Sequence, residues 1–266
     1  MTTILVTGGT GALGRQVVPL LAQRGAQVRI LSRRSQQVNG AEVMQGDLAT
    51  GAGLAEAVRG ADVVVHCATD PRLGRTDVRG TGQLLEAATA AARPHVVYIS
   101  IVGIDRIPFG YYRTKLASEV LIRDSGLPWT VLRATQFHDL VLQVVAALAK
   151  PPLVVVPRGM ATQPVDIGEV AQRLASLALG EPAGRVPDFG GPQVWTIEDA
   201  TRAYLAARAL SRRIVRVPLP GAAARAFRAG WNLLRDGEQG SRTFEEFLAQ
   251  RVQPGGAVEL TYSLKR

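Results

Sequence analysis

The sequence has only one cysteine, Cys67, among its 266 residues. A lone cysteine forms neither an internal disulfide nor a thiolate metal cluster, which excludes a disulfide-stapled scaffold and favours a reducing compartment. The sequence also shows no apolar run long enough to cross a bilayer and no signal-like opening segment. We therefore expect a cytoplasmic protein with no membrane partner.

Lysine is scarce too, since it occurs only at positions 115, 150 and 265. Arginine consequently carries nearly all of the positive charge behind the formal net charge of +9. The basic residues are scattered in runs no longer than Arg33-Arg34 or Arg212-Arg213, and no finger, basic-zipper or aromatic RNA-binding motif accompanies them. We expect no nucleic-acid partner.

Hydrophobic residues are plentiful, at 47% of the chain, so a substantial core can form. In the first half, short β-branched runs alternate with Ala- and Leu-rich stretches of helical period, which is the pattern of successive βαβ units. This pattern predicts an α/β fold built on a doubly wound, mostly parallel Rossmann sheet. The predicted strands are Thr3–Thr7, Gln27–Leu31, Glu42–Met44, Asp62–His66, His95–Ser100 and Trp129–Arg133.

The pattern changes after Lys150, where a smaller C-terminal α/β lobe is predicted to begin. A buried-looking strand at Leu153–Val156 follows, and a second short strand at Ile214–Val217 is expected to pair with it. Two helices are expected to cover the pair, each with a hydroxyl residue as its N-cap. The helices lie near Ile197–Leu210 and Thr243–Gln250, and the candidate caps are Thr196 and Ser241 or Thr243.

A glycine-rich segment, Thr7-Gly8-Gly9-Thr10-Gly11-Ala12-Leu13-Gly14, connects the first strand to a helical pattern. This setting is typical of dinucleotide binding, because the free N–H groups at a helix N-terminus bind a pyrophosphate. Gly8 would permit the tight turn, Gly11 the close approach of the pyrophosphate, and Gly14 the packing of the helix on the strand. The expected coenzyme contacts here are Gly8, Thr10, Gly11, Ala12, Leu13 and Gly14.

The second strand leads into Ser32-Arg33-Arg34, where a site that prefers NAD places a carboxylate for the ribose 2′-hydroxyl. No acid stands here, and a guanidinium can grip a 2′-phosphate in bidentate fashion and stack on adenine. We therefore predict NADP (NADPH) as the cofactor, bound by Ser32, Arg33 and Arg34, with Arg33 ahead of Arg34. The alternative is that both arginines are solvated loop residues.

Residues after two further strands complete the predicted coenzyme site. Asp47 and Leu48 follow the third strand, and Asp47 would either accept a hydrogen bond from the adenine amino group or cap the next helix. Cys67, Ala68 and Thr69 end the fourth strand beside the expected nicotinamide ribose, with Cys67 as a small apolar filler rather than a reactive thiol.

These residues, together with several later segments, resemble an atypical short-chain dehydrogenase/reductase of the NmrA-like NAD(P)H-binding family, which includes quinone and triphenylmethane reductases. The later segments are Tyr98-Ile99-Ser100 with Gly103, Tyr111 to Lys115, Leu132-Arg133 and Pro164-Val165-Asp166. The resemblance covers nearly the whole chain and implies that residues 164–191 return to the nucleotide domain. The predicted division is a Rossmann domain over 1–150 with 164–191, interleaved with a small substrate-binding lobe over 151–163 and 192–266.

Tyr111 and Lys115 stand four residues apart, hence on one face of a helix. They match the YxxxK motif of the superfamily, and the resemblance implies that Lys115 holds the nicotinamide ribose and assists the phenol of Tyr111. Tyr111 would then protonate a carbonyl oxygen as hydride arrives. The alternative for the pair is an ordinary amphipathic helix with a solvated lysine.

Two positions depart from the superfamily pattern. The fifth strand ends in Ser100-Ile101, where core members carry two hydroxyl residues and the second binds the substrate oxygen. Asp77 stands where the family has an asparagine that supports a proton relay. Ser100 takes part in catalysis or merely caps the strand, Asp77 would cap the following helix, and Tyr111 alone would have to polarise the acceptor.

The loop after the sixth strand is expected to pass over the nicotinamide. Gln136 would reach its carboxamide and His138 would serve as a substitute acid, unless His138 simply begins a helix and meets solvent. His66 lies in an apolar strand and is expected to be a hydrogen-bonded core residue. No His, Cys and carboxylate cluster has metal spacing, so no metal is expected.

The leading hypothesis is an NADPH-dependent oxidoreductase that transfers hydride to a small, largely apolar carbonyl, enone or quinone. Its catalytic candidates are Tyr111, Lys115, Ser100 and His138. The alternatives are a non-catalytic NADP(H)-binding redox sensor of the NmrA type and a cofactor-retaining epimerase or lyase. We expect a small-molecule partner and either a monomer or a homodimer.

Overall fold

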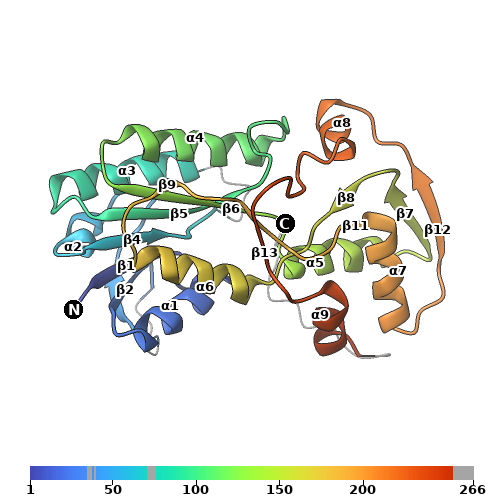
Figure 1. The fold of residues 1–266 in the computed structure, drawn as a ribbon, viewed down its shortest axis with the longest axis horizontal. Helices are drawn as coiled ribbons and strands as arrows, with labels where there is room; N and C mark the ends of the chain where they lie inside the picture. Colours follow the sequence, from blue (N-terminus) through green and yellow to red (C-terminus); the bar gives the residue numbers. More distant parts are fainter. Residues whose placement is uncertain (35–37, 39, 71–75, 254–266) are drawn as a thin grey trace. The chain divides into compact units, whose positions relative to one another are not determined.

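The computed structural model describes residues 1–34, 38, 40–70 and 76–253, and its chain divides into two compact units (Figure 1). Unit 1 contains residues 1–100, 110–133 and 168–187, and unit 2 contains residues 101–109, 134–167 and the chain from 188 onward. The division differs from the predicted boundary at Lys150, because residues 101–109 and 134–150 fall in unit 2. The assignment of a substrate-binding role to the smaller lobe stays a prediction.

Unit 1 is built on a parallel sheet with the strand order β3-β2-β1-β4-β5-β6, and the short β9, Gly184–Arg185, pairs with β6 (Figure 1). The order reverses between β1 and β4, which is the switch point of a doubly wound sheet. All six predicted strands are present, with ends displaced by at most one residue. They are β1 Thr3–Thr7, β2 Gln27–Ser32, β3 Glu42–Gln45, β4 Val63–His66, β5 His95–Ile101 and β6 Trp129–Ala134.

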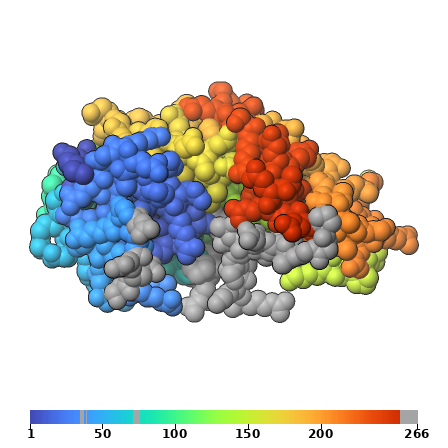
Figure 2. Space-filling view, turned by 90° about the horizontal axis from the view of Figure 1, so that it is seen from below, coloured from blue at the N-terminus to red at the C-terminus, as the bar shows by residue number. Residues whose placement is uncertain are grey.

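Helices cover both faces of this sheet, which is why β1 and β4 are buried along their whole length. On one face α1, Gly14–Gln23, lies beside α6, Ile167–Ala178 (Figures 1 and 2), and Arg24 donates a hydrogen bond to Ser176 at 2.9 Å. The other face carries α3, Asp77–Ala90, and α4, Gly110–Asp124. The short α2, Leu54–Val58, packs with α3 and the strands around a buried apolar cluster.

Unit 2 contains the predicted pair of strands, β7 Leu153–Pro157 and β12 Arg213–Val217, and the two run parallel. The predicted covering helices are α7, Ile197–Ala207, and α9, Phe244–Arg251, which share a buried core with β7 and α5, His138–Leu148. The side chains of Thr196 and Thr243 cap α7 and α9, and Thr243 forms a capping box with Glu246. Both predicted caps are therefore confirmed, with Thr243 rather than Ser241 as the second.

The remaining elements of unit 2 are short. Ala134, the last residue of β6, belongs to unit 2 and pairs with Phe189 of β10, Phe189–Gly190. Strand β10 pairs in turn with β13, Glu238–Gln239, and with these two strands the mostly parallel sheet has nine strands among the described residues. The other elements are β8 Ala161–Thr162, β11 Trp195–Thr196 and α8 Ala222–Arg228. Within the described ranges, no helix combines the length and apolarity needed to cross a membrane.

Candidate functional site

The glycine-rich loop turns tightly against the end of β4. Gly8 has a φ of +70°, and a Cβ built on it would lie 2.7 Å from the backbone of Ala68. A Cβ on Gly14 would lie 2.2 Å from the carbonyl oxygen of Gly8, so Gly14 packs against the loop itself rather than on the strand. The N–H of Gly11 donates to that same oxygen at 2.9 Å. Side chains at Gly8 and Gly14 would fill the space that the loop needs.

The backbone N–H groups of Ala12 and Leu13 precede α1 and donate to no other described residue. Free N–H groups at the start of a helix can donate hydrogen bonds to a pyrophosphate. The loop therefore fits the phosphates of a dinucleotide. The sequence reasoning missed one residue of the turn, Gly9, where a Cβ would lie 2.6 Å from Ile30 in β2. The Gly8-Gly9 doublet was the available signal.

The end of β2 presents two exposed arginines. Ser32 is buried, and its hydroxyl donates to the carbonyl of Arg34 at 2.9 Å and accepts from the N–H of Arg34 at 3.2 Å. This local turn leaves the side chains of Arg33 and Arg34 in solvent. The hydroxyl of Ser32 is thus engaged with the backbone, and the arginines are the groups at this position that suit a phosphate.

Asp47 shapes the turn after β3. Its Oδ1 accepts from the N–H of Ala49 at 2.9 Å, whereas the N-cap position of α2 is occupied by Gly53. The prediction that Asp47 caps the next helix is therefore wrong, and its contact with adenine stays a prediction. Leu48 lies against α3, where a Cβ on Gly80 would approach its side chain to 3.1 Å.

The end of β4 brings the coenzyme loop close to the predicted catalytic pair. Ala68 adjoins Gly8, and Cys67 lies near the ammonium of Lys115. Burial raises the pKa of the Cys67 thiol to about 12, against the weaker opposing effect of Lys115. The thiol therefore stays protonated at neutral pH, as expected for a filler rather than a nucleophile.

Lys115 is buried, with 4% of its surface exposed, so the alternative of a solvated lysine is wrong. Its Nζ donates to the carbonyl of Ile99 in β5 at 2.9 Å and lies 4.2 Å from the ring centre of Tyr98. Burial lowers the pKa of Lys115, while Tyr111 and Asp77 act in the opposite direction. A buried ammonium with donors left for a ligand can hold ribose hydroxyls.

The hydroxyl of Tyr111 lies 3.2 Å from Oγ1 of Thr69, beyond the end of β4. Thr69 also donates to Oδ2 of Asp77 at 2.7 Å, and Oδ1 of Asp77 accepts from the N–H of Asp70 at 2.6 Å. Asp77 is the first residue of α3 and its carboxylate binds these two groups, so the expectation that it caps the helix is wrong.

Ser100, near the end of β5, is buried, and its Oγ has no hydrogen-bond partner in the described part of the chain. Buried hydroxyls usually have partners, so this one has capacity for a ligand. The following residue, Ile101, is half-buried and supplies no hydroxyl.

Gln136 and His138 belong to unit 2 and are engaged there. Oε1 of Gln136 accepts from Thr162 at 2.9 Å, and its amide nitrogen donates to the backbone of Asn232 at 3.3 Å. His138 begins α5 but is fully buried, so the expectation that it meets solvent is wrong. Its Nε2 lies 3.1 Å from the carbonyl oxygen of Pro164, and burial lowers its pKa to about 4. These contacts give no support to a role for either side chain at the nicotinamide.

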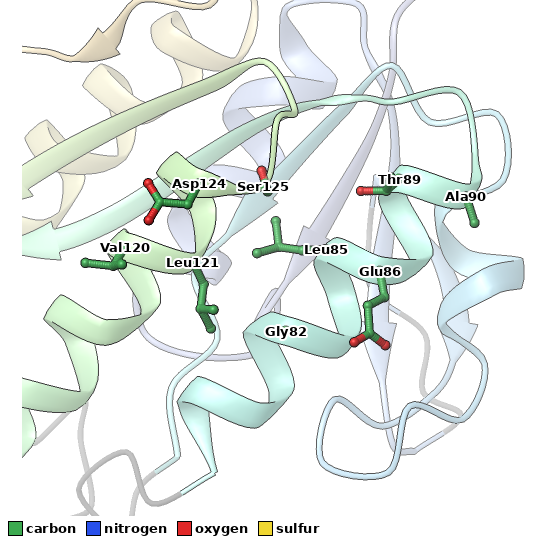
Figure 3. Close-up of a pocket in the computed structure, with 9 residues that line it drawn as sticks. All are labelled: Gly82, Leu85, Glu86, Thr89, Ala90, Val120, Leu121, Asp124 and Ser125. Carbon is green, nitrogen blue, oxygen red and sulfur yellow. The ribbon is translucent and has the colours of Figure 1, made fainter.

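A pocket of about 590 Å³ lies between the C-terminal halves of α3 and α4 (Figure 3). Asp77 and Tyr111 lie at the opposite, N-terminal ends of these helices, so the pocket is separate from the predicted coenzyme site. It is lined by Gly82, Leu85, Glu86, Thr89, Ala90, Val120, Leu121, Asp124 and Ser125. In the described residues, no group of three or more His, Cys, Asp or Glu side chains could hold a metal ion.

Comparison with known sequences identifies relatives over most of the chain. Residues 8–150 match a family model described as NAD(P)H-binding. The chain is 33% identical over 208 residues to a (4-alkanoyl-5-oxo-2,5-dihydrofuran-3-yl)methyl phosphate reductase of Streptomyces griseus, which covers 74% of this chain and 71% of the relative. It is 28% identical over 231 residues to the photosystem II assembly factor Ycf39 of Trieres chinensis, with 82% and 72% covered.

Comparison with solved structures confirms the predicted fold. The NADPH-dependent quinone oxidoreductase of Escherichia coli, complexed with NADPH, matches with a TM-score of 0.77 at 18% identity, over 93% of this chain and 99% of that one. The triphenylmethane reductase of Citrobacter sp., complexed with NADP(H), matches with a TM-score of 0.67 at 20% identity, over 97% of each chain.

Proposed function

Because this chain belongs to the NAD(P)H-binding family, as an atypical short-chain dehydrogenase/reductase, we propose that it is an NADPH-dependent reductase of a small, largely apolar carbonyl, enone or quinone. One observation carries the proposal: the end of β4 touches the glycine loop at Ala68 and lies near the buried ammonium of Lys115 at Cys67. A dinucleotide held by the loop would thus extend toward Lys115 and Tyr111.

Different residues of the site would bind different parts of the coenzyme. The N–H groups of Ala12 and Leu13 would bind the pyrophosphate, and Arg33 would bind the 2′-phosphate. Lys115 would donate to the ribose hydroxyls of the nicotinamide half from its buried position. When bound, NADPH would supply a hydride, hence two electrons, to the substrate and leave as NADP⁺.

Tyr111 is the proposed general acid. Its O–H bond would break as the substrate oxygen takes the proton, and solvent would return a proton to the phenolate after turnover. The neighbouring ammonium of Lys115 would stabilise the negative charge that forms on Tyr111. The orphaned hydroxyl of Ser100 would accept or donate one further hydrogen bond in the same site. The reductase named among the relatives supports this class of reaction.

The test mixes the purified protein with NADPH and a panel of quinones, cyclic enones and aryl ketones, and follows coenzyme oxidation by absorbance. We expect turnover with at least one acceptor, and a loss of roughly 10²-fold or more in kcat for Tyr111→Phe with NADPH affinity unchanged. Tyr112→Phe is the matched control, because it removes the same hydroxyl group from the adjacent, buried tyrosine. This variant is expected to keep the activity. Equal rates for wild type and Tyr111→Phe would refute the assignment.

A second candidate is a non-catalytic NADP(H) sensor. The observation that favours it is Ile101, which leaves the site without the second hydroxyl of core relatives, and one relative is named an assembly factor. Tight NADPH binding without turnover of any acceptor would establish this function instead.

A further inference from the structure

The number of hydroxyl protons available to the hydrogen bonds around Tyr111 determines which way its own hydroxyl points. Thr69 has one hydroxyl proton, and it donates this proton to Oδ2 of Asp77 at 2.7 Å. A carboxylate only accepts, so Asp77 cannot return a proton to Thr69. The 3.2 Å contact between Thr69 and Tyr111 must then be donated by Tyr111. The single phenolic proton is directed at Thr69 and away from any ligand.

Asp77 is held in the orientation that imposes this direction. Its Oδ1 accepts from the N–H of Asp70 at 2.6 Å, which leaves Oδ2 for Thr69. Two described neighbours of Tyr111 do not accept its proton. Nζ of Lys115 donates to the carbonyl of Ile99, and the ring centre of Tyr112 lies 6.5 Å from that of Tyr111. In the part of the chain that the structure describes, Lys115 from α4 and Asp77 from α3 are the charged groups nearest to this network.

We propose that Thr69 and Asp77 are positioning residues that turn the Tyr111 hydroxyl inward, so that Tyr111 offers a ligand its oxygen lone pairs. In this state the site selects a ligand with a hydroxyl to donate, such as an alcohol, a hydroquinone or a ribose. Donation to a carbonyl requires the Tyr111 O–H group to turn away from Thr69 and give up that hydrogen bond. The kinetic part of this proposal rests on the reductase function proposed above, whereas the direction of the hydroxyl does not.

The variant Asp77→Asn should reverse the direction of the hydrogen bonds that join Tyr111, Thr69 and residue 77, while the same groups stay in contact. The amide oxygen would keep the bond from the N–H of Asp70, so the amide nitrogen would take the place of Oδ2 and donate to Thr69. The Thr69 proton would then go to Tyr111, and the Tyr111 proton would turn outward. Asp77→Asn should therefore be a better carbonyl reductase than the wild type, by roughly threefold to tenfold in kcat, the value of about one hydrogen bond.

The direct readout is the ultraviolet resonance Raman doublet of tyrosine, whose intensity ratio distinguishes a donating phenol from an accepting one. The spectrum of Tyr111 is obtained on the coenzyme-free protein as the difference from Tyr111→Phe. We expect a donating phenol in the wild type and in Thr69→Ser, and an accepting phenol in Asp77→Asn. Thr69→Val removes the link, so adding Asp77→Asn to it should leave the Tyr111 signal unchanged.

The outcomes separate this inference from the proposed function. An unchanged Tyr111 signal in Asp77→Asn, or an equal change in the Thr69→Val background, would overturn the inference even if the protein reduces quinones. The expected spectra together with no turnover of any acceptor would uphold the inference and refute the reductase. Where turnover exists, a rise in kcat for Asp77→Asn with unchanged NADPH affinity supports the reversal, and a fall contradicts it.

Discussion

At the scale of single residues, the coenzyme preference depends on the charge at the end of β2. Arg33 and Arg34 are exposed there, and the fold of this segment is set by Ser32 and the backbone rather than by either guanidinium. Replacing an arginine should therefore change ligand binding and leave the local structure intact. This separation makes the NADP assignment directly testable.

We predict that Arg33→Ala weakens NADPH binding by roughly 10- to 100-fold, because a charge-assisted bidentate hydrogen bond to the 2′-phosphate is lost. NADH carries no 2′-phosphate, so its affinity should fall by at most about fivefold, the value of the stacking contact on adenine. Isothermal titration calorimetry with both coenzymes measures the two effects. Arg59→Ala is the matched control, because Arg59 is an exposed arginine at the end of α2 and pairs with the surface acid Glu56.

Wild-type protein that binds NADH as tightly as NADPH would refute the assignment. An equal loss for both coenzymes in Arg33→Ala would instead identify Arg33 as a general contact to the dinucleotide. If Arg34→Ala shows the larger loss of NADPH affinity, the expected order of the two arginines is wrong.

Several site residues were predictable because their types are tied to local geometry. Gly8 stands at a positive φ, and the YxxxK spacing alone puts Tyr111 and Lys115 on one helical face. The hydrogen-bonded link from Thr69 to Tyr111 was not predictable, because it joins residues 42 positions apart and depends on how the start of α4 lies against the loop after β4. The burial of His138 depends likewise on tertiary packing, against Phe244 and Phe247 of the distant α9.

At the scale of elements, one buried ion pair attaches α4 to the sheet. Arg133 in β6 donates from Nε and Nη2 to the two carboxylate oxygens of Glu119 in α4, at 2.9 and 2.7 Å. The side chains are only 6% and 11% exposed. Because α4 also carries Tyr111 and Lys115, this pair fixes the helix that positions the proposed catalytic residues.

We predict that Glu119→Ala destabilises the protein by about 3–5 kcal/mol, because it leaves the Arg133 guanidinium buried without its counter-charge. Chemical denaturation followed by circular dichroism measures the loss. The double variant Glu119→Leu with Arg133→Met should recover most of it, since an apolar pair of similar volume removes the unpaired charge. A loss below about 1 kcal/mol in Glu119→Ala would show that the pair behaves like an exposed surface ion pair.

The central strands were predictable to within a residue because burial on both faces makes a strand a short β-branched run, as in Val63–His66. The pairing of β7 with β12 was predicted from a β-branched run in each strand, whereas its parallel direction was not predicted. The short strands were not predictable, because two residues such as Phe189–Gly190 carry no periodicity. Their positions depend on close backbone approaches, such as the one that requires Gly191 beside the carbonyl of Pro164.

At the scale of the whole molecule, all three histidines are internal. His66 lies in β4 and bonds to Thr7 at 2.6 Å and to Thr81 at 3.0 Å, which confirms the expectation of a hydrogen-bonded core residue. Burial lowers its pKa to about 3, with a smaller effect from Lys115. Burial lowers the pKa of His138 to about 4 and also lowers the pKa of His95, against the opposing effect of Glu181.

These pKa shifts predict a loss of stability in weak acid. Above about pH 7.5 the imidazoles are neutral in both the folded and the unfolded chain, so they do not affect the pH dependence of stability. Below pH 6.5 the unfolded chain takes up protons that the folded chain excludes, and stability falls until the pH reaches the folded pKa values of about 3 and 4. Each histidine contributes a slope of up to about 1.4 kcal/mol per pH unit.

Urea denaturation at intervals between pH 7.5 and 4.5 should therefore give a free energy of unfolding that is flat at the upper end and falls below about pH 6.5. The carboxylates add to the fall only near and below about pH 5, so the interval from 6.5 to 5 isolates the histidines. In that interval His95→Gln should reduce the slope of the unfolding free energy against pH by up to about 1.4 kcal/mol per pH unit, because the glutamine amide does not titrate. A stability that stays constant down to pH 5, or an imidazole resonance that titrates near 6.5 in the folded protein, would contradict the buried neutral histidines.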